Sequence, residues 1–189
     1  MLILRNARYL ATAYLQAVIC SGDTVIDATM GNGRDTEMLA QYVGPGGHVD
    51  AFDVQAQAIE RTTERLAQAG LTDRVRLHHV GHEQIASYVQ TPVRAAVFNL
   101  GWLPGGDKTV TTRVETTCLA VEACLRLLLP GGVLSLCAYP GHAEGDRERI
   151  AVQNHLARLA PQEFSVLHHA FINYPNDPPE LFLVQRALI

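Results

Sequence analysis

The chain has 189 residues, of which 48% are hydrophobic, and a formal net charge of −4. This length and composition can bury one sizeable core, so we expect one domain over residues 1–189, with residues 1–22 as a helical segment packed on it. The acidic balance excludes a globally basic nucleic-acid-binding protein, and any RNA contact must come from a local basic patch. No apolar run is long enough to cross a membrane, and we expect a cytoplasmic protein.

The cysteines and histidines show no metal-ligand spacing. The four cysteines lack a C-x-x-C pair and lie mostly among apolar residues, which predicts reduced, buried packing residues. The eight histidines have no cysteine or carboxylate at a matching spacing, so we expect no metal site.

In chain order, apolar residues first recur at helical spacing over Leu4–Ile19, which predicts a helix. The β-branched residues of Val25–Asp27 then predict a buried strand with a carboxylate at its carboxyl end. A turn over Gly31–Gly33 follows, and the next helix has an acidic first turn. Strand, glycine turn and helix form the first unit of a nucleotide-binding α/β fold, because glycines let a ligand approach the backbone closely.

The glycine turn matches one class of nucleotide ligand better than another. The dinucleotide fingerprint G-x-G-x-x-G fails at its third position, which is Thr36. Asp27, Gly31 and Gly33 instead have the spacing of the first motif of S-adenosylmethionine (SAM) methyltransferases. SAM carries no pyrophosphate but has a cationic amino group, which a carboxylate at a strand end suits. The alternative is a strand–turn–helix crossover that binds nothing.

A second carboxylate stands where a ribose would need one. The predicted strand His48–Asp53 ends about 20 residues beyond the glycine turn, where nucleotide-binding folds place an acid for ribose hydroxyls. The helix Gln55–Ala69 follows, and then a third strand, Arg74–Val80. Gly81 and His82 come directly after that strand and are candidates for the wall of an adenine pocket, the alternative for His82 being the start of a short helix.

The fourth predicted strand, Arg94–Asn99, runs into a glycine-rich loop that ends at Lys108. A polar residue at the end of a strand, followed by small and aromatic residues, is typical of an active-site loop. The loop is similar to the Asn-Pro-Pro-aromatic tetrapeptide of methyltransferases that act on exocyclic amines, with Leu-Gly in place of Pro-Pro. Amide and backbone carbonyls can hold the N–H groups of a nitrogen nucleophile, so we expect Asn99 to orient an amine. Trp102 is predicted to stack on a base or shape its pocket, the alternative being packing.

The rest of the chain completes five βα units and two closing strands. We expect a helix over Thr111–Leu129, a strand over Val133–Ala138, a loop over Tyr139–Asp146, a helix over Arg147–Leu159, and strands over Phe164–Phe171 and Leu181–Gln185. This is the layout of the Rossmann-like class I SAM-dependent methyltransferase fold. It predicts a seven-stranded, mostly parallel sheet with an antiparallel last strand and helices on both faces.

A more specific resemblance is carried by several segments, of which Asn99–Lys108 is the most distinctive. The others are Asp27–Thr36, Phe52–Gln55, Gly81–Glu83, Tyr139–His142 with Gly145, and Asn173 followed by Pro178. Through them the chain from Arg5 to Gln185 resembles the bacterial putative rRNA methylase family. That family is now associated with tRNA 5-(aminomethyl)-2-thiouridine methyltransferase activity at the wobble position.

The resemblance implies methyl transfer from SAM to the aminomethyl nitrogen of 5-aminomethyl-2-thiouridine in the anticodon stem-loop of tRNA, giving 5-methylaminomethyl-2-thiouridine. A homodimer is compatible with it. The cofactor-binding residues expected from the motifs and the resemblance together are Asp27, Gly31, Asn32, Gly33, Arg34, Asp53, Gln55, Gly81 and His82. The expected substrate-binding residues are Trp102, which stands in place of an expected Tyr, Lys108 and Tyr139.

The methyl group of SAM is already activated, so the reaction needs positioning and an unprotonated amine more than acid–base chemistry. Asp107 and His142 are candidate acceptors for the departing proton, which can also leave through water. Candidate phosphate contacts are Lys108, Arg113, Arg147 and Arg149. Alternatives within the fold are methylation of rRNA or of a small-molecule amine. A non-catalytic nucleotide-binding module or an NAD-dependent oxidoreductase would be a different class, and the missing third glycine argues against NAD.

Overall fold

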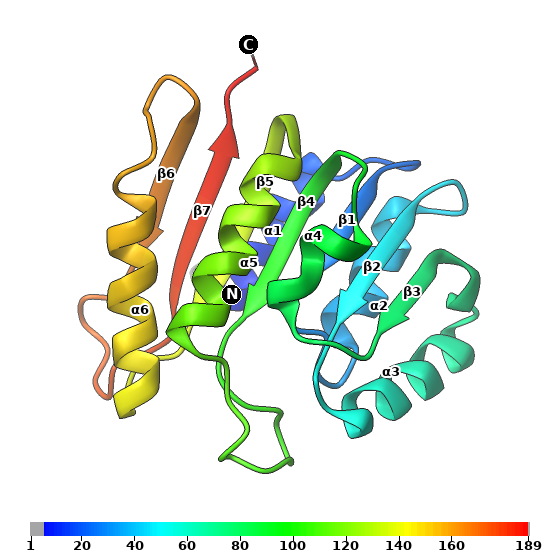
Figure 1. Ribbon diagram of the computed structural model, residues 1–189, viewed down its shortest axis with the longest axis horizontal. Coiled ribbons are helices and arrows are strands. Elements are labelled where there is room, and N and C mark those ends of the chain that lie inside the picture. Colours follow the sequence, from blue (N-terminus) through cyan, green and yellow to red (C-terminus); the bar gives the residue numbers. More distant parts are fainter. Residues whose placement is uncertain (1–5, 189) are drawn as a thin grey trace.

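The computed structural model describes residues 6–188. Seven strands form a single sheet in the order β3-β2-β1-β4-β5-β7-β6, flanked by helices (Figure 1). The strands are β1 Thr24–Asp27, β2 His48–Phe52, β3 Val75–His78, β4 Val93–Asn99, β5 Leu128–Ala138, β6 Phe164–His169 and β7 Glu180–Arg186. The helices are α1 Ala7–Val18, α2 Arg34–Val43, α3 Ala56–Ala69, α4 Ile85–Tyr88, α5 Val114–Leu127 and α6 Ala143–Leu156, with 3-10 turns at Thr72–Arg74 and His82–Gln84.

Strand directions confirm the predicted topology. Strands β1 to β5 are parallel, whereas β7 is antiparallel to both of its neighbours, β5 and β6. The carboxyl ends of the parallel strands therefore meet at one edge, the lower edge in Figure 1, where the long loop between β4 and α5 projects. In open α/β sheets this edge is the one that binds ligands.

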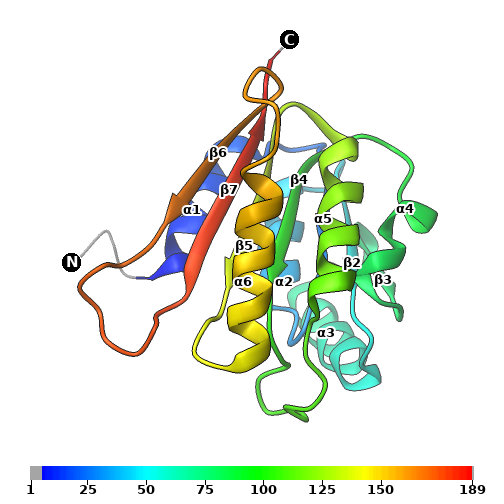
Figure 2. The same cartoon turned by 60° about the vertical axis from the view of Figure 1, so that its left-hand side comes forward.

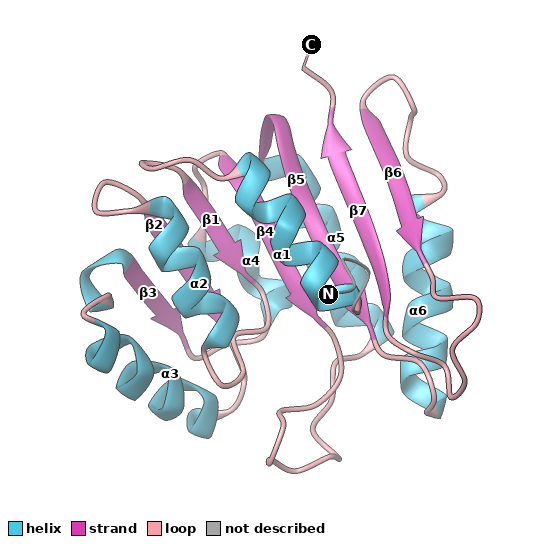
Figure 3. Ribbon diagram, turned by 180° about the vertical axis from the view of Figure 1, so that it is seen from behind, coloured by secondary structure: helices cyan, strands magenta, loops and turns pink. Residues whose placement is uncertain are grey.

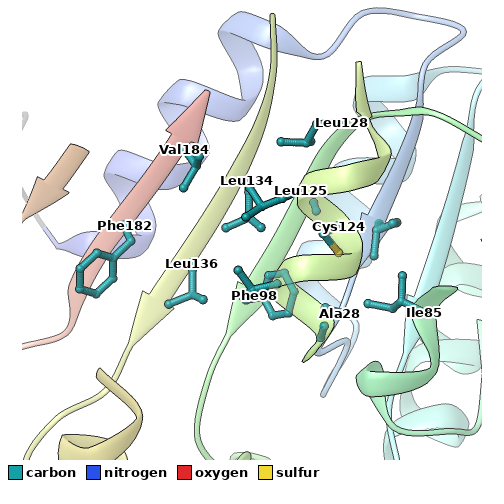
Figure 4. Packing of buried hydrophobic residues seen from close by; sticks show 14 of the residues in the cluster. Ala28, Ile85, Phe98, Cys124, Leu125, Leu128, Leu134, Leu136, Phe182 and Val184 are labelled. Carbon is teal, nitrogen blue, oxygen red and sulfur yellow. The ribbon is translucent and has the colours of Figure 1, made fainter. Parts of the chain in front are cut away.

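Helices cover both faces of the sheet. α1 and α2 lie on one face with α3 packed beside α2 (Figure 3), and α4, α5 and α6 lie on the other, so that the sheet is sandwiched between them (Figure 2). Alternate residues of a strand enter opposite layers: Phe98 of β4 packs among Leu134, Leu136 and Phe182 on the α5 side (Figure 4), and Val97 packs on the α1–α2 side. Burial on both faces explains why the central strands β1 and β4 contain apolar runs.

The boundary between α5 and β5 differs from the prediction. The helix was expected to continue through Leu129 and to end at the Pro-Gly-Gly sequence, but α5 ends at Leu127 and β5 begins at Leu128. Leu128 pairs with Val93, and the register with β4 then shifts before the pairing resumes at Val133. Gly131 has φ 75°, a conformation that favours glycine. The Pro-Gly-Gly sequence therefore forms an irregularity inside β5 instead of a helix stop.

Helix α6 begins earlier than expected, at Ala143 instead of Arg147. Gly145 made a loop plausible at this position, yet it lies inside the helix. A Cβ atom on Gly145 would be 2.2 Å from the carbonyl oxygen of Tyr139, so only glycine fits this close approach. The loop after β5 is therefore shorter than predicted, and His142 becomes the N-cap of α6.

Other expectations have mixed outcomes. The predicted Leu4–Ile19 helix is observed as α1, and Leu4 and Arg5 lie outside the described residues. The four cysteines are free; Cys124 and Cys137 are buried, but Cys20 is exposed and is not a packing residue. Within residues 6–188, no helix is long and apolar enough to span a membrane. In that same range, no group of three or more metal-ligating side chains could hold an ion.

Candidate active site

A cavity of about 640 Å³ opens at the carboxyl edge of the sheet, a volume in the range of small-molecule sites. It is lined by the turns after β1, β2, β3, β4 and β5 together with Arg8 of α1. Most of the predicted site residues meet there: Gly31, Asn32, Arg34, Asp53, Gln55, Gly81, His82, Asn99, Trp102, Tyr139 and His142. Four others, Asp27, Gly33, Asp107 and Lys108, do not line this cavity.

The glycine turn after β1 is shaped by backbone constraints. Gly33 has φ 73°, and a Cβ atom there would lie 2.8 Å from Thr62 Oγ1 of α3, so both the backbone and the neighbouring helix require glycine. Gly31 has φ 50°, and its N–H donates to Asp53 Oδ2 over 3.0 Å. The turn is therefore locked to the end of β2.

Asp53 is held by backbone groups alone. Its Oδ2 accepts the Gly31 bond and its Oδ1 accepts from the N–H of Gln55 over 2.9 Å, while burial raises the pKa of its carboxyl. Each carboxylate oxygen can accept a further hydrogen bond. Asp53 thus faces the cavity as a pre-oriented acceptor, which fits the two hydroxyls of a ribose.

Asp27 has a different environment from the one predicted. It is fully buried, and its carboxylate accepts from Thr36 Oγ1 over 2.6 Å and from the Thr29 N–H over 3.2 Å. Burial, together with the nearby charge of Asp35, raises its pKa to about 7. In this arrangement Asp27 ties the start of α2 to the turn, and no cavity surface is left to it for a cofactor amino group.

His82 forms part of the cavity wall below β3. It is only 7% exposed, and burial lowers its pKa, so its ring is neutral at pH 7. A neutral, buried ring suits a wall against an apolar face of a base better than it suits a charge contact. The predicted short helix is also present, because residues 82–88 form a 3-10 turn followed by α4.

Asn32 points toward the long loop after β4. Its Nδ2 donates to the carbonyl of Pro104 over 3.1 Å, and its Oδ1 accepts from Arg61 Nη1 over 2.8 Å. Arg65 also donates to the Asn32 carbonyl and to Glu37. Arg61 and Arg65 of α3 therefore brace the glycine turn.

Asn99 is held by hydrogen bonds to the turn after β1 and to the first turn of α2. Its backbone N–H donates to Thr29 Oγ1 over 2.7 Å, and its Nδ2 donates to Asp35 Oδ2 over 2.5 Å. Asp35 Oδ1 in turn accepts from Arg8 over 2.5 Å. The Oδ1 of Asn99 is buried and has no hydrogen-bond partner. Sequence patterns did not identify Arg8 or Asp35 as site residues; the acidic first turn of α2 was the one available signal.

Trp102 lies in the loop at the cavity mouth and is 37% exposed. Its ring centroid is 4.7 Å from that of His142, and Lys108 Nζ lies 5.5 Å from the centre of the ring. Trp102 also forms an isolated β-bridge with Thr111 across the loop. A partly exposed aromatic ring at this place can present a face to a base.

Neither candidate proton acceptor has the geometry of a base. The Nδ1 of His142 accepts from the N–H of Gly145 over 3.1 Å, which puts the ring proton on Nε2 and makes that atom a donor. Asp107 is exposed and accepts two bonds from Thr109, and these bonds lower the pKa of its carboxyl. Neither His142 nor Asp107 is therefore placed to accept a proton from a group bound in the cavity.

The loop is anchored at its base by a buried acid that sequence patterns missed. Glu148 of α6 is 2% exposed and accepts from Thr112 Oγ1 over 2.7 Å and from Thr117 Oγ1 over 2.5 Å. Thr112 Oγ1 also accepts from the N–H of Gly101 over 2.8 Å. The two limbs of the loop are therefore joined to each other and to α6.

The basic residues fall into two groups. Arg147 and Arg149, two of the predicted phosphate contacts, face the carboxylates of Glu144 and Glu180 at 3.3 and 3.7 Å. Arg34 and Arg113 line the cavity with no side-chain hydrogen bond or ion pair, and Lys108 contacts only the ring of Trp102. Among the described residues, the one other arginine or lysine side chain without a polar partner is that of Arg158, which is exposed in the turn after α6.

Known proteins share this architecture. The family model described as Putative rRNA methylase matches residues 49–185. The chain is 38% identical to the chloroplastic tRNA (mnm(5)s(2)U34)-methyltransferase of Arabidopsis thaliana, in a match that covers 96% of this chain and 70% of that protein.

Two solved structures are similar over nearly their whole length. A putative rRNA methylase from Clostridium thermocellum has a TM-score of 0.96 and 39% identity, covering 98% of this chain and all of that one. A putative methyltransferase from Streptococcus mutans, solved in complex with SAH, has a TM-score of 0.90 and 38% identity, covering 98% and 99%. The acceptor pair at Asp53 and the neutral wall at His82 fit the ribose and base of SAM, which is the cofactor. The chain therefore belongs to the putative rRNA methylase family of SAM-dependent methyltransferases.

Proposed function

We propose that this enzyme transfers the methyl group of SAM to the aminomethyl nitrogen of 5-aminomethyl-2-thiouridine at the wobble position of tRNA. The product would be 5-methylaminomethyl-2-thiouridine. The similarity to the chloroplastic enzyme, which extends over 96% of this chain, supports the substrate class. The single structural observation that supports a nitrogen nucleophile is the environment of Asn99.

Asn99 offers an acceptor to the substrate. Because a carboxylate can only accept, Asp35 must face the NH₂ group of the Asn99 amide, and Oδ1 is left without a partner. Asn99 also lines a small cavity of about 10 Å³ under α1, together with Ser135. That volume accommodates at most about one water, so the room for a substrate lies in the large cavity, which Asn99 lines as well. An amide oxygen without a partner suits the N–H groups of an amine and disfavours a carboxylate nucleophile.

The surroundings also favour an unprotonated amine. Leu100 and Leu103 are each 4% exposed and line the cavity beside Asn99. Apolar surroundings disfavour the charged form and lower the pKa of an alkylamine. The nearest carboxylate, Asp35, already pairs with Arg8 and does not present an unbalanced charge that would hold the ammonium form. The lone pair can then be aimed at the methyl carbon.

The cavity mouth is suited to a nucleic acid. Arg34 and Arg113 line the cavity without a carboxylate partner, and Lys108 lies over the ring of Trp102, which also lines it, although the whole chain carries a net charge of −4. Cations that are free of internal partners can bind phosphates, and Trp102 can stack on a base. We therefore propose that the anticodon stem-loop docks over the loop between β4 and α5, with the wobble base entering beside Trp102.

Nucleoside mass spectrometry of tRNA from a deletion strain tests this function. The strain is expected to accumulate 5-aminomethyl-2-thiouridine and to lose its methylated form. The wild-type gene should restore the methylated nucleoside, and a gene carrying Asn99→Ala should restore little of it. Unchanged tRNA nucleosides together with a missing methyl group in rRNA would instead support the alternative rRNA substrate.

A further inference from the structure

Three side chains from three separate elements form a line beside the reaction end of the cavity. Arg8 of α1, Asp35 of α2 and Asn99 of β4 are joined by two hydrogen bonds of 2.5 Å each. Each carboxylate oxygen of Asp35 serves one neighbour, Oδ1 for Arg8 and Oδ2 for Asn99. None of these bonds belongs to the glycine turn or to the ribose contact.

The hydrogen bonds among Arg8, Asp35 and Asn99 determine the orientation of the Asn99 amide. An asparagine amide can rotate by half a turn, which exchanges its donor NH₂ and its acceptor oxygen. A carboxylate beside it accepts from NH₂ but repels the amide oxygen, so Asp35 selects one of the two orientations. Arg8 fixes the carboxylate itself, since its guanidinium holds the opposite oxygen in a charge-assisted bond.

Asp35 is well placed to link the two halves of the site. It is the second residue of α2, and this helix starts directly at Gly33, whose position is set by its contact with Thr62. The next residue, Thr36, is bonded to the buried Asp27. The first turn of α2 is thus rigidly attached to the cofactor-binding turn. Through its hydrogen bond to Asn99, Asp35 fixes the Asn99 side chain relative to that turn.

We infer that Asp35 is a positioning residue of the methyl transfer that acts through Asn99, and that Arg8 acts through Asp35. Helix α1 is therefore part of the active site and not only a cover for the sheet. The inference rests on the proposed role of Asn99 in holding the nucleophile. It adds that this role depends on a carboxylate and a guanidinium that need not touch the substrate.

A double-mutant cycle on Asp35 and Asn99 tests the inference. The assay measures transfer of labelled methyl from SAM to tRNA isolated from the deletion strain, at saturating SAM. Asp35→Asn keeps the size of the side chain but no longer selects one amide orientation, and we expect kcat to fall about 10- to 100-fold, as misplaced reacting groups do. SAM affinity should change less than about threefold, because Asp53 is untouched. In an Asn99→Ala background the same substitution should have no further effect on kcat.

Glu122→Gln is the matched control. It removes an acid and breaks an exposed ion pair with Arg126 on α5, and neither residue lines the cavity. Wild-type kcat is expected for this variant. Arg8→Met should lower kcat less than Asp35→Asn, and Arg8→Lys should restore part of the loss, because a lysine can still hold Asp35. These Arg8 variants keep the test decisive should the Asp35 variant fold poorly.

The outcomes separate the two proposals. If Asn99→Ala is slow while Asp35→Asn and Arg8→Met both have wild-type kcat, the positioning role is wrong and the role of Asn99 stands. If Asp35→Asn lowers kcat equally in the wild-type and Asn99→Ala backgrounds, Asp35 does not act through Asn99 and the inference is overturned. If Asn99→Ala itself is fully active, the proposed role of Asn99 fails first.

Discussion

The proposed cofactor end and the proposed substrate end of the cavity are built in different ways. At the cofactor end, Asp53 is held by two backbone N–H groups and Gly33 by its own φ angle and the contact with α3. At the substrate end, Asn99 is oriented by Asp35 and Arg8, and the loop is held by Glu148, all through side chains from distant elements. A site that depends on backbone geometry can be recognised from a short local sequence motif. A chain of contacts between side chains of distant elements has no such motif.

Asn99→Ala should break the substrate end alone. Loss of a group that orients the reacting atom typically lowers kcat by about 100- to 1,000-fold, and we expect a fall of that size in single-turnover methylation of tRNA. SAM affinity, measured by titration calorimetry, should stay within about threefold of wild type, because the Asp53 contacts remain. If SAM binding and the melting temperature collapse together, the loop is structural and the two ends are not separable.

Asp27→Asn should reveal the cost of burying a carboxylate at the cofactor end. Burial raises the pKa of Asp27 in the folded protein to about 7, from about 3.8 in the unfolded chain. The folded state therefore binds the proton more tightly, and the stability that Asp27 contributes falls as pH rises between these two values. Between pH 5 and pH 8 the wild type should lose about 3 kcal/mol relative to Asp27→Asn. Urea unfolding of both proteins at the two pH values, without cofactor, measures the difference. A constant difference would show that Asp27 is ionised at all these pH values.

Asp53→Ala should break the cofactor end alone. Removal of a charged acceptor for ribose hydroxyls typically costs about 1–3 kcal/mol, so SAM and SAH should both bind more weakly by that amount. kcat at saturating SAM should change much less than in Asn99→Ala, because Asn99 and Asp35 keep their contacts. An unaltered SAM dissociation constant would remove Asp53 from the site.

Trp102→Ala should sharpen the description of the substrate end by separating base binding from chemistry. The ring is 37% exposed at the mouth, and base stacking typically contributes about 1–3 kcal/mol, which predicts a higher KM for tRNA. Trp102→Phe should recover part of this loss, since it keeps an aromatic face. A lower melting temperature for Trp102→Ala without any change in KM would assign the ring to packing.

The smallest expected effect is that of a single phosphate contact. Arg113→Gln should weaken tRNA binding modestly and reduce the slope of log affinity against log salt by about 1. Arg158→Gln removes the same charge from an unpaired arginine in the turn after α6, outside the cavity lining, and is the matched control. Equal salt slopes for the two variants would place the RNA elsewhere.

The same contrast explains what could be predicted from the sequence. The strands and the residues Gly31, Asp53 and His82 follow from apolar periodicity and local spacing, and the structure brings all three residues to the cavity. The antiparallel strand was predicted from the resemblance to the layout of SAM-dependent methyltransferases. Asp27 has the right spacing but is buried, because Thr36 and Thr29 use its oxygens.

Residues that come from remote elements could not be predicted. Arg8 reaches the site only because α1 packs against β4, β5 and β7. No local sequence pattern predicts this packing. Glu148 is one acid among several in α6, and its role depends on threonines 31 and 36 residues away. His142 was predicted as a base. At the start of α6, however, its Nδ1 accepts a hydrogen bond from the Gly145 N–H and caps the helix.

The anchoring of the loop by Glu148 also bears on how tRNA leaves after reaction. Because Gly101 is bonded to Thr112, Thr112 to Glu148, and Trp102 is bridged to Thr111, the stem of the loop is tied together and residues 103–110 form its tip. Opening of the tip need not melt the first turn of α5 or move β4. Product release can therefore proceed by a short flap motion on a fixed base, which leaves Asn99 in place for the next turnover.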